Sequence, residues 1–112
     1  MDSLPVVKGT LDPLVLKALS GEAMHGFEVT AWIEDRSAGT LEFDDSAVYH
    51  ALYRLERRLL IGAEWGVTEN NRRARYYRLT RAGHRHLASE TARLIRFTDT
   101  MVDILTSPAG RT

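Results

Sequence analysis

Apolar side chains recur every three or four positions along four segments of the chain, a spacing that gathers them on one face of a helix. We therefore predict helices over about residues 10–20, 25–34, 46–59 and 80–105. Residues 41–43 alternate between apolar and polar side chains and predict a very short strand. Residues 62–67 and 74–79 contain strand-forming aromatic side chains and flank a polar tip with two asparagines, which predicts a β-hairpin. The expected fold class is mainly α with a small β-hairpin.

Short polar side chains stand where three of the predicted helices begin. Thr10 and Thr80 each carry a hydroxyl that can accept a hydrogen bond from a free N–H of the first turn. Asp44 or Asp45 can do the same for the third helix. On the second helix, we expect Phe27 to face the core.

The third predicted helix has two different faces. Val48, Leu52, Leu55 and Leu59 follow one another at spacings of four, three and four, so they form one buried face. The opposite face collects hydroxyls, a histidine, a phenol and arginines: Ser46, His50, Tyr53, Arg54 and Arg57, with Tyr49 at its border. A buried face backed by such side chains is typical of a helix that enters a DNA groove.

The last predicted helix carries a seam with a heptad spacing. Its members follow at intervals of four, three, four, three and four residues: Leu87, Thr91, Leu94, Thr98, Met101 and Leu105, widened by Ile95 and Val102. A helix of about 25 residues after so small a domain has little of its own chain to pack against. We expect a partner helix, most simply from a second copy; the alternative is that the helix folds back over its own core. The chain then divides into a DNA-binding domain, 1–80, and a dimerisation helix with its tail, 81–112.

Length and composition narrow the function classes. The chain has 112 residues, which is typical of one domain, and it contains no cysteine, so disulfides and thiolate metal sites are excluded. The longest segment without Asp, Glu, Lys or Arg is 46–53, eight residues long. That is far short of the roughly 20 apolar residues that span a bilayer. We therefore expect no transmembrane helix and no signal peptide, and a cytoplasmic location.

The formal net charge is zero, but the charges are unevenly distributed. Residues 1–53 hold three basic and nine acidic residues, a net charge of −6, whereas residues 54–85 hold nine basic and three acidic residues, a net charge of +6. All nine of these bases are arginines, whose planar fork suits phosphates and guanine edges. This asymmetry favours a polyanionic partner for one face; the alternative is a solvated, arginine-rich surface.

Three helices, a hairpin with a basic tip and a long closing helix make up a winged helix-turn-helix. Four motifs carry a closer resemblance: GTLD at 9–12, HGFEV at 25–29, AVYHALYRLE at 47–56 and RYYRLTRAG at 75–83. Together they resemble the PadR family of bacterial transcriptional regulators, over roughly residues 8–105. The resemblance implies a homodimer that binds a palindromic operator, usually as a repressor, with the third helix in the major groove and the wing tip at the backbone or minor groove. The last helix would carry the dimer interface.

The resemblance also assigns residues. Tyr49 matches a family tyrosine expected to contact DNA, and Arg72, Arg73 and Arg75 match the basic wing. With the exposed face of the third helix, the predicted DNA-binding set is Ser46, Tyr49, His50, Tyr53, Arg54, Arg72, Arg73 and Arg75. Two positions depart from the family pattern: His50, where proline is common, and Leu60, where a glycine usually ends the helix before the first wing strand.

A short final helix resembles the smaller branch of the family, whose members are often relieved by small apolar ligands or drugs. Phe97, the only aromatic residue of the last helix, could line a ligand cavity at the dimer centre; the alternative is plain interface packing. An aromatic clamp around such an effector would need a further ring, such as Trp32.

Other function classes have less support. His84 and His86 are two apart on a helix and point in different directions, so no metal site is predicted, and no cofactor is expected. The sequence contains no nucleophile elbow or phosphate loop, so we predict no enzyme. Two alternatives stay open: a winged-helix module that binds protein through the basic face, and a ligand sensor whose DNA role is secondary. Salt-dependent retention of duplex DNA separates the first alternative from a DNA-binding regulator.

Overall fold

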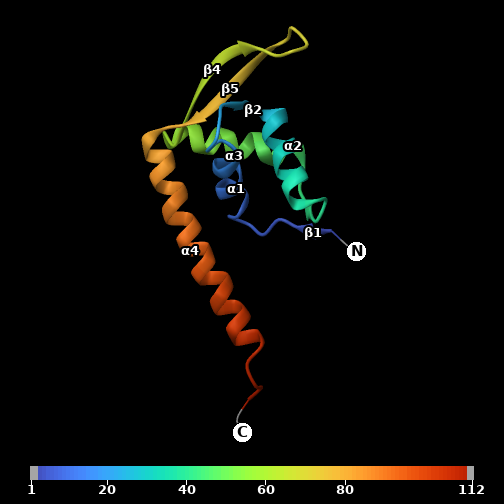
Figure 1. The fold of residues 1–112 in the computed structure, drawn as a ribbon, viewed down its shortest axis with the longest axis vertical. Helices are drawn as coiled ribbons and strands as arrows, with labels where there is room; N and C mark the ends of the chain where they lie inside the picture. Colours follow the sequence, from blue (N-terminus) through green and yellow to red (C-terminus); the bar gives the residue numbers. More distant parts are fainter. Residues whose placement is uncertain (1–2, 111–112) are drawn as a thin grey trace.

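The computed structural model describes residues 3–110, which form a helical domain with a projecting β-hairpin and a long C-terminal helix (Figure 1). The helices are α1 (Leu11–Ala18), α2 (Gly26–Ser37), α3 (Asp45–Arg57) and α4 (Arg81–Leu105). The strands are β1 (Leu4–Pro5), β2 (Met24–His25), β3 (Leu41–Glu42), β4 (Ile61–Val67) and β5 (Arg73–Leu79). The predicted fold class is confirmed, and the bounds of the predicted elements are correct to within three residues at most ends.

The strands form two small sheets. β4 and β5 pair antiparallel from Ile61 opposite Leu79 to Val67 opposite Arg73, and β2 pairs with the other edge of β5. β1 pairs with β3 in parallel. β1 and β2 were not predicted, because a strand of two residues is too short to show alternation. We call the hairpin of residues 61–79 the wing.

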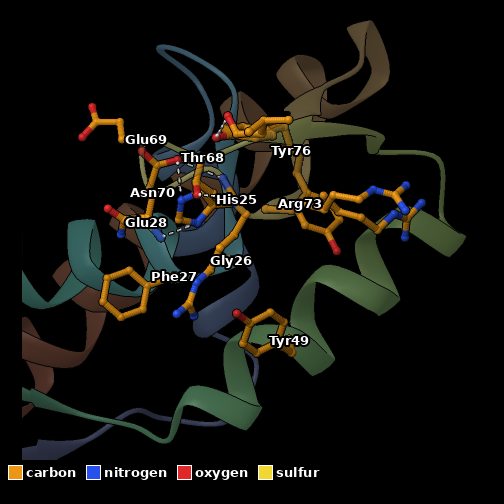
Figure 2. A pocket seen from close by; sticks show the side chains of 15 residues that line it. His25, Gly26, Phe27, Glu28, Tyr49, Thr68, Glu69, Asn70, Arg73 and Tyr76 are labelled. Atoms are coloured by element: carbon orange, nitrogen blue, oxygen red, sulfur yellow. Dashed lines mark hydrogen bonds and ion pairs between the residues drawn. The ribbon is translucent and has the colours of Figure 1, made fainter.

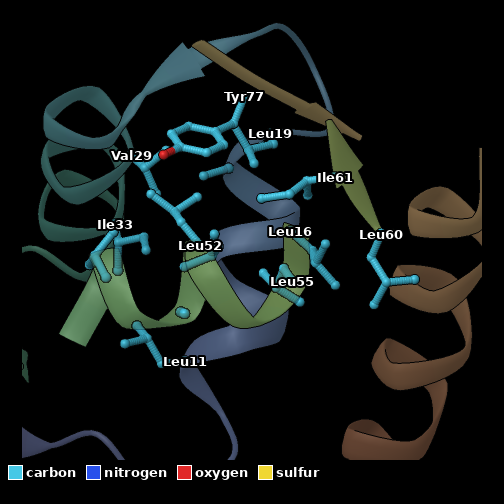
Figure 3. Close-up of a cluster of buried hydrophobic side chains, with 14 residues drawn as sticks. Leu11, Leu16, Leu19, Val29, Ile33, Leu52, Leu55, Leu60, Ile61 and Tyr77 are labelled. Carbon is cyan, nitrogen blue, oxygen red and sulfur yellow. The ribbon is translucent and has the colours of Figure 1, made fainter. Parts of the chain in front are cut away.

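The core lies between α1, α2, α3 and the base of the wing (Figure 3). Its largest fully buried side chains are Leu16, Leu52, Leu55, Ile61, Val15, Val29 and Val48. The prediction for Phe27 is wrong, because its side chain is 72% exposed. Val29 and Ile33, four residues apart, form the buried face of α2, and Phe27 lies two residues before Val29, on the opposite side of the helix.

The helix caps follow the predictions in part. The Thr80 hydroxyl accepts a hydrogen bond from the Gly83 N–H at 3.0 Å and donates one to the Leu59 carbonyl at 2.8 Å. The Thr10 hydroxyl makes no cap, because it donates to the Val7 carbonyl instead, at 2.6 Å. Neither predicted aspartate caps α3: Asp44 occupies the cap position without a side-chain hydrogen bond, and Asp45 is the first residue of the helix.

α3 ends in a left-handed residue, which sets the direction of the wing. Leu59 has φ 61°, and its N–H bonds the Glu56 carbonyl while the Leu60 N–H bonds the Leu55 carbonyl. These two hydrogen bonds form a Schellman motif, in which glycine is the preferred residue at the left-handed position. Leu59, one residue before the position at which the resemblance expects a glycine, adopts the conformation that favours glycine, and Leu60 is buried in the core. The prediction that Leu59 belongs to the buried face of α3 is wrong: its side chain is 74% exposed, because α3 ends at Arg57 and the helical spacing no longer holds at position 59.

Candidate nucleic-acid interface

The exposed face of α3 contains the predicted side chains. Ser46, Tyr49, His50 and Tyr53 are all exposed, Tyr53 by 61% and Tyr49 by 50%. The Tyr53 hydroxyl accepts a hydrogen bond from Arg57 at 3.2 Å, and the Arg57 guanidinium lies 5.7 Å from the centre of the Tyr53 ring. The phenol of Tyr53 and its neighbouring cation are thus held together on the open face of the helix.

Tyr49 lies where α3 meets the start of α2 and the wing. A cleft of ≈ 900 Å³ separates the wing from these helices, and Tyr49, Gly26, Phe27, Arg73 and Tyr76 are among its lining residues (Figure 2). Tyr49 is 50% exposed, so its ring is partly packed while the rest of the side chain is open to the cleft. Such a tyrosine can pack with its ring and donate its hydroxyl to a phosphate.

The start of α2 is fixed by a reciprocal cap that sequence reasoning missed. His25 Nδ1 accepts a hydrogen bond from the Glu28 N–H at 3.3 Å, and Glu28 Oε1 accepts one from the His25 N–H at 3.1 Å. The imidazole also packs edge-on against Tyr76 of β5, with ring centres 5.4 Å apart. The signal was present in the sequence, since His25 and Glu28 have the spacing of a capping box, but histidine is an unusual residue at that position.

The wing arginines fall into two groups. Arg75 donates twice to the Glu56 carboxylate of α3, at 3.1 and 2.9 Å, and this hydrogen bonding raises the pKa of Arg75 above its ordinary value. Arg78 forms an ion pair with Glu64 at 3.0 Å. Arg72 and Arg73, near the tip, are exposed and have no carboxylate partner among residues 3–110. Arg75 therefore connects the wing to α3, while Arg72 and Arg73 leave their charge available.

Arg54 is engaged by its own chain. Its guanidinium donates to both carboxylate oxygens of Asp12 in α1, from Nη2 at 2.6 Å and from Nε at 3.4 Å. The hydrogen bond to Asp12 raises the pKa of Arg54 above its ordinary value. The Arg54 side chain is still 52% exposed, so part of it stays open to solvent beside the α3 face. The sequence placed Arg54 on the correct face but did not predict Asp12 as its partner.

α4 changes character along its length. Ala82 and Leu87, near its start, pack partly against the core of the chain, whereas the rest of the helix projects from the domain (Figure 1). Thr91, Ile95, Thr98, Met101, Val102 and Leu105 of the predicted seam are all exposed, and Leu94 is partly buried. A groove of ≈ 770 Å³ runs between α1 and this seam, and its apolar lining includes Pro13, Leu14, Leu41, Leu87, Leu94 and Ile95.

The two candidate effector residues do not meet within one chain. Phe97 is 56% exposed on α4. Trp32 lines a separate small cavity between α1 and α2, with the Arg36 guanidinium 5.0 Å from the centre of one of its rings. An aromatic clamp formed by these two side chains would need the rings to come from different chains.

Residues 3–110 contain neither a cluster of metal ligands nor a membrane-spanning helix. Within this part of the chain, no group of three or more histidines and carboxylates could hold a metal ion. No helix among the same residues is long and apolar enough to cross a membrane.

Comparison with known proteins identifies the family of the chain. The sequence profile of the Transcriptional regulator PadR-like family matches residues 15–89, more than half of the chain. The chain belongs to the PadR-like family of transcriptional regulators. The members of this family are transcriptional regulators and not enzymes, and membership implies DNA-binding regulation.

Solved structures share the fold of this PadR-like regulator across nearly the whole chain. A Streptococcus mutans UA159 structure, smu.1704, has a TM-score of 0.82 at 22% identity and covers 97% of this chain and 98% of its own. A PadR family transcriptional regulator from Eggerthella lenta DSM 2243 has a TM-score of 0.76 at 26% identity, covering 90% of this chain and 86% of its own. A curated Lysinibacillus sphaericus relative, uncharacterized protein X, is 25% identical over 83 residues, 74% of this chain and 76% of the relative.

Proposed function

We propose that the chain is a sequence-specific DNA-binding repressor that acts as a homodimer on a palindromic operator and is released by a small effector. The observation that carries this proposal is the arrangement of α3 and the wing. The exposed side chains of α3, Ser46, Tyr49, His50 and Tyr53, lie beside a hairpin whose tip arginines have no carboxylate partner among residues 3–110.

α3 has the properties of a helix that enters the major groove. Val48, Ala51, Leu52 and Leu55 anchor one side of it in the core, so the helix is held rigidly while its other side stays free. The free side offers hydroxyls, an imidazole and a phenol, which can donate to and accept from base edges. Tyr49 lies nearer the wing and is the side chain we assign to the phosphate backbone.

The wing supplies charge rather than sequence readout in this proposal. Arg72 and Arg73 neutralise phosphates and release counterions, so binding weakens steeply as salt rises. Arg75 acts indirectly, because its guanidinium is occupied by the Glu56 carboxylate. This ion pair fixes the angle between the wing and α3. Arg54 reaches DNA only by giving up part of its pairing with Asp12, or contacts it with the donors that Asp12 leaves free.

The dimer forms through α4 in this proposal. The exposed seam lines the groove between α1 and α4, and together they present apolar side chains that a partner would cover. The α4 helix of a second copy, with the same heptad spacing, covers both. A two-fold axis between the copies then sets the distance between the two α3 helices, and so the spacing of the operator half-sites.

An effector site belongs to the same region. Phe97 and the apolar lining of the α1–α4 groove suit a small apolar or aromatic molecule that changes how the two α4 helices pack. A change there alters the separation of the recognition helices and weakens operator binding. Trp32 takes part only if the partner's α4 approaches its cavity.

The test is fluorescence anisotropy with the DNA directly upstream of the protein's own gene, against a scrambled duplex of the same length, at two salt concentrations. Tight, salt-sensitive binding with a large preference for the upstream duplex is expected. The alternative function, a winged-helix module that binds protein through its basic face, predicts no salt-dependent retention of either duplex. Binding that is salt-sensitive but equal for both duplexes argues against this operator and calls for selection from random DNA.

A further inference from the structure

Trp65 of β4 is a large aromatic side chain that the roles proposed above do not use. It is 60% exposed, although tryptophan is among the side chains that gain most from burial. Val67, two residues on and therefore on the same face of the strand, is 61% exposed. Together they form an uncovered apolar surface on the outer half of the wing.

This surface is on the side of the wing that faces α3. Trp65 pairs with Arg75, and Ala63 pairs with Tyr77, so all four side chains lie on one face of the sheet. Tyr77 is buried in the core, and Arg75 reaches the Glu56 carboxylate of α3. The face that carries Trp65 therefore continues outward from the core and from α3, on the side where the exposed helix surface lies.

Trp65 is coupled to one of the two available wing cations. The Arg73 guanidinium lies 4.7 Å from the centre of a Trp65 ring, within the range of a cation–π contact. Because a ring offers no hydrogen-bond acceptor in its plane, the N–H groups at the edge of the guanidinium stay free for an anion. The apolar ring of Trp65 and the available charge of Arg73 are thus neighbours on the wing surface.

We propose that Trp65 is a DNA-contacting residue of the wing, whose ring packs against the deoxyribose next to a phosphate held by Arg73. The inference rests on the proposed function and adds a residue to it. Apolar sugar surface alternates with anionic phosphate along a DNA backbone. The Trp65 ring suits the sugar, and the Arg73 guanidinium suits the phosphate.

The chain provides its own reporter, because it has only two tryptophans, Trp65 and the partly buried Trp32. The experiment follows tryptophan emission and its quenching by acrylamide while the upstream duplex is added. The same titration is repeated with Trp65→Phe, which keeps a ring at the site and leaves Trp32 as the sole emitter. A duplex-induced loss of emission and protection from acrylamide are expected for the wild-type protein and not for Trp65→Phe.

A second measurement distinguishes a direct contact from a supporting role. Trp65→Ala is expected to weaken duplex binding about tenfold, with the slope of affinity against salt unchanged, because Arg73 still neutralises its phosphate. A lower salt slope would mean that the ring acts only by holding Arg73 and would overturn the contact. Should Trp65→Ala fail to fold, as judged by circular dichroism, the emission experiment on the wild-type protein decides alone.

Two experimental results separate the role of Trp65 from the proposed function. If the wild-type protein binds the duplex by anisotropy while Trp65 stays equally accessible to acrylamide, Trp65 is no DNA contact and the repressor proposal stands. If no duplex binds at either salt concentration, the proposed function fails and the role of Trp65 fails with it.

Discussion

The ring of Tyr49 lies directly against the backbone of Gly26, and this contact connects α3 to the start of α2. A Cβ placed on Gly26 would lie 2.7 Å from Cζ and 2.9 Å from the hydroxyl oxygen of Tyr49, closer than non-bonded atoms approach. The neighbouring His25 caps the same helix, so the glycine is held in place. The His-Gly pair and the tyrosine of α3 are therefore one structural unit, although they are more than twenty residues apart.

This contact predicts that Gly26→Ala displaces the Tyr49 ring. If Tyr49 bonds a phosphate, Gly26→Ala and Tyr49→Ala should each weaken operator binding by about tenfold, the value of one hydrogen bond of about 1.4 kcal/mol. Folding should change little, because the half-exposed ring can rotate toward solvent. Anisotropy and thermal unfolding measure the two effects.

The matched control is Gly62→Ala in β4, where an added Cβ meets nothing within 4 Å. This variant should bind DNA as the wild-type protein does. Wild-type affinity for both Gly26→Ala and Tyr49→Ala would remove Tyr49 from the set of DNA contacts.

The sequence predicted what depends on local pattern. Val48, Leu52 and Leu55 on the buried face of α3, the two wing strands and the Thr80 cap follow from local spacing and residue type. Leu59 fits the same spacing but is 74% exposed, because α3 ends before it. The pairing of Arg54 with Asp12 and of Arg75 with Glu56 could not be predicted. The first pair is 42 positions apart and the second 19, so the proximity of the partners depends on tertiary packing. The same holds for Phe27, whose place on α2 depends on which side of that helix meets the core.

The division of the wing arginines predicts different effects of their removal. Arg72→Ala with Arg73→Ala should lower affinity for every duplex and reduce the slope of log affinity against log salt by about 1.8, since each phosphate contact contributes about 0.9. Arg78→Ala should change the slope little, because Arg78 is paired with Glu64. Anisotropy at four or more salt concentrations gives the slopes. A loss of sequence preference with an unchanged slope would mean that the tip reads bases instead.

The exposed seam of α4 predicts that a charge at Ile95 prevents dimerisation. Ile95→Glu places two like charges across the proposed two-fold interface, so the chain should become monomeric at micromolar concentration while keeping its helical content. Sedimentation and circular dichroism measure these two properties. Ala92→Glu, on the polar side of the same helix, should stay dimeric. An unchanged dimer in Ile95→Glu would place the interface elsewhere.

The left-handed residue at the end of α3 predicts that the chain is less stable there than it could be. Leu59 adopts φ 61°, a conformation that costs a side chain with a Cβ roughly 1–2 kcal/mol relative to glycine. Its side chain is 74% exposed, so little apolar burial is lost when it is removed. Leu59→Gly should therefore raise the free energy of unfolding by roughly 0.5–1 kcal/mol, reduced from the full amount by the greater freedom of glycine in the unfolded chain.

The comparison with Leu59→Ala isolates the backbone cause. Alanine removes the same exposed side chain but keeps the Cβ, so it should leave stability unchanged or slightly lower it. Urea unfolding of all three proteins at one protein concentration gives the free energies, since the stability of a dimer depends on concentration. Equal stabilities for the glycine and alanine variants would show that the cost of the left-handed conformation at position 59 does not exceed the entropy that glycine adds to the unfolded chain. A gain for glycine alone would show that the bend into the wing is kept at the expense of stability, with its angle fixed by the Schellman hydrogen bonds and by Arg75 on Glu56.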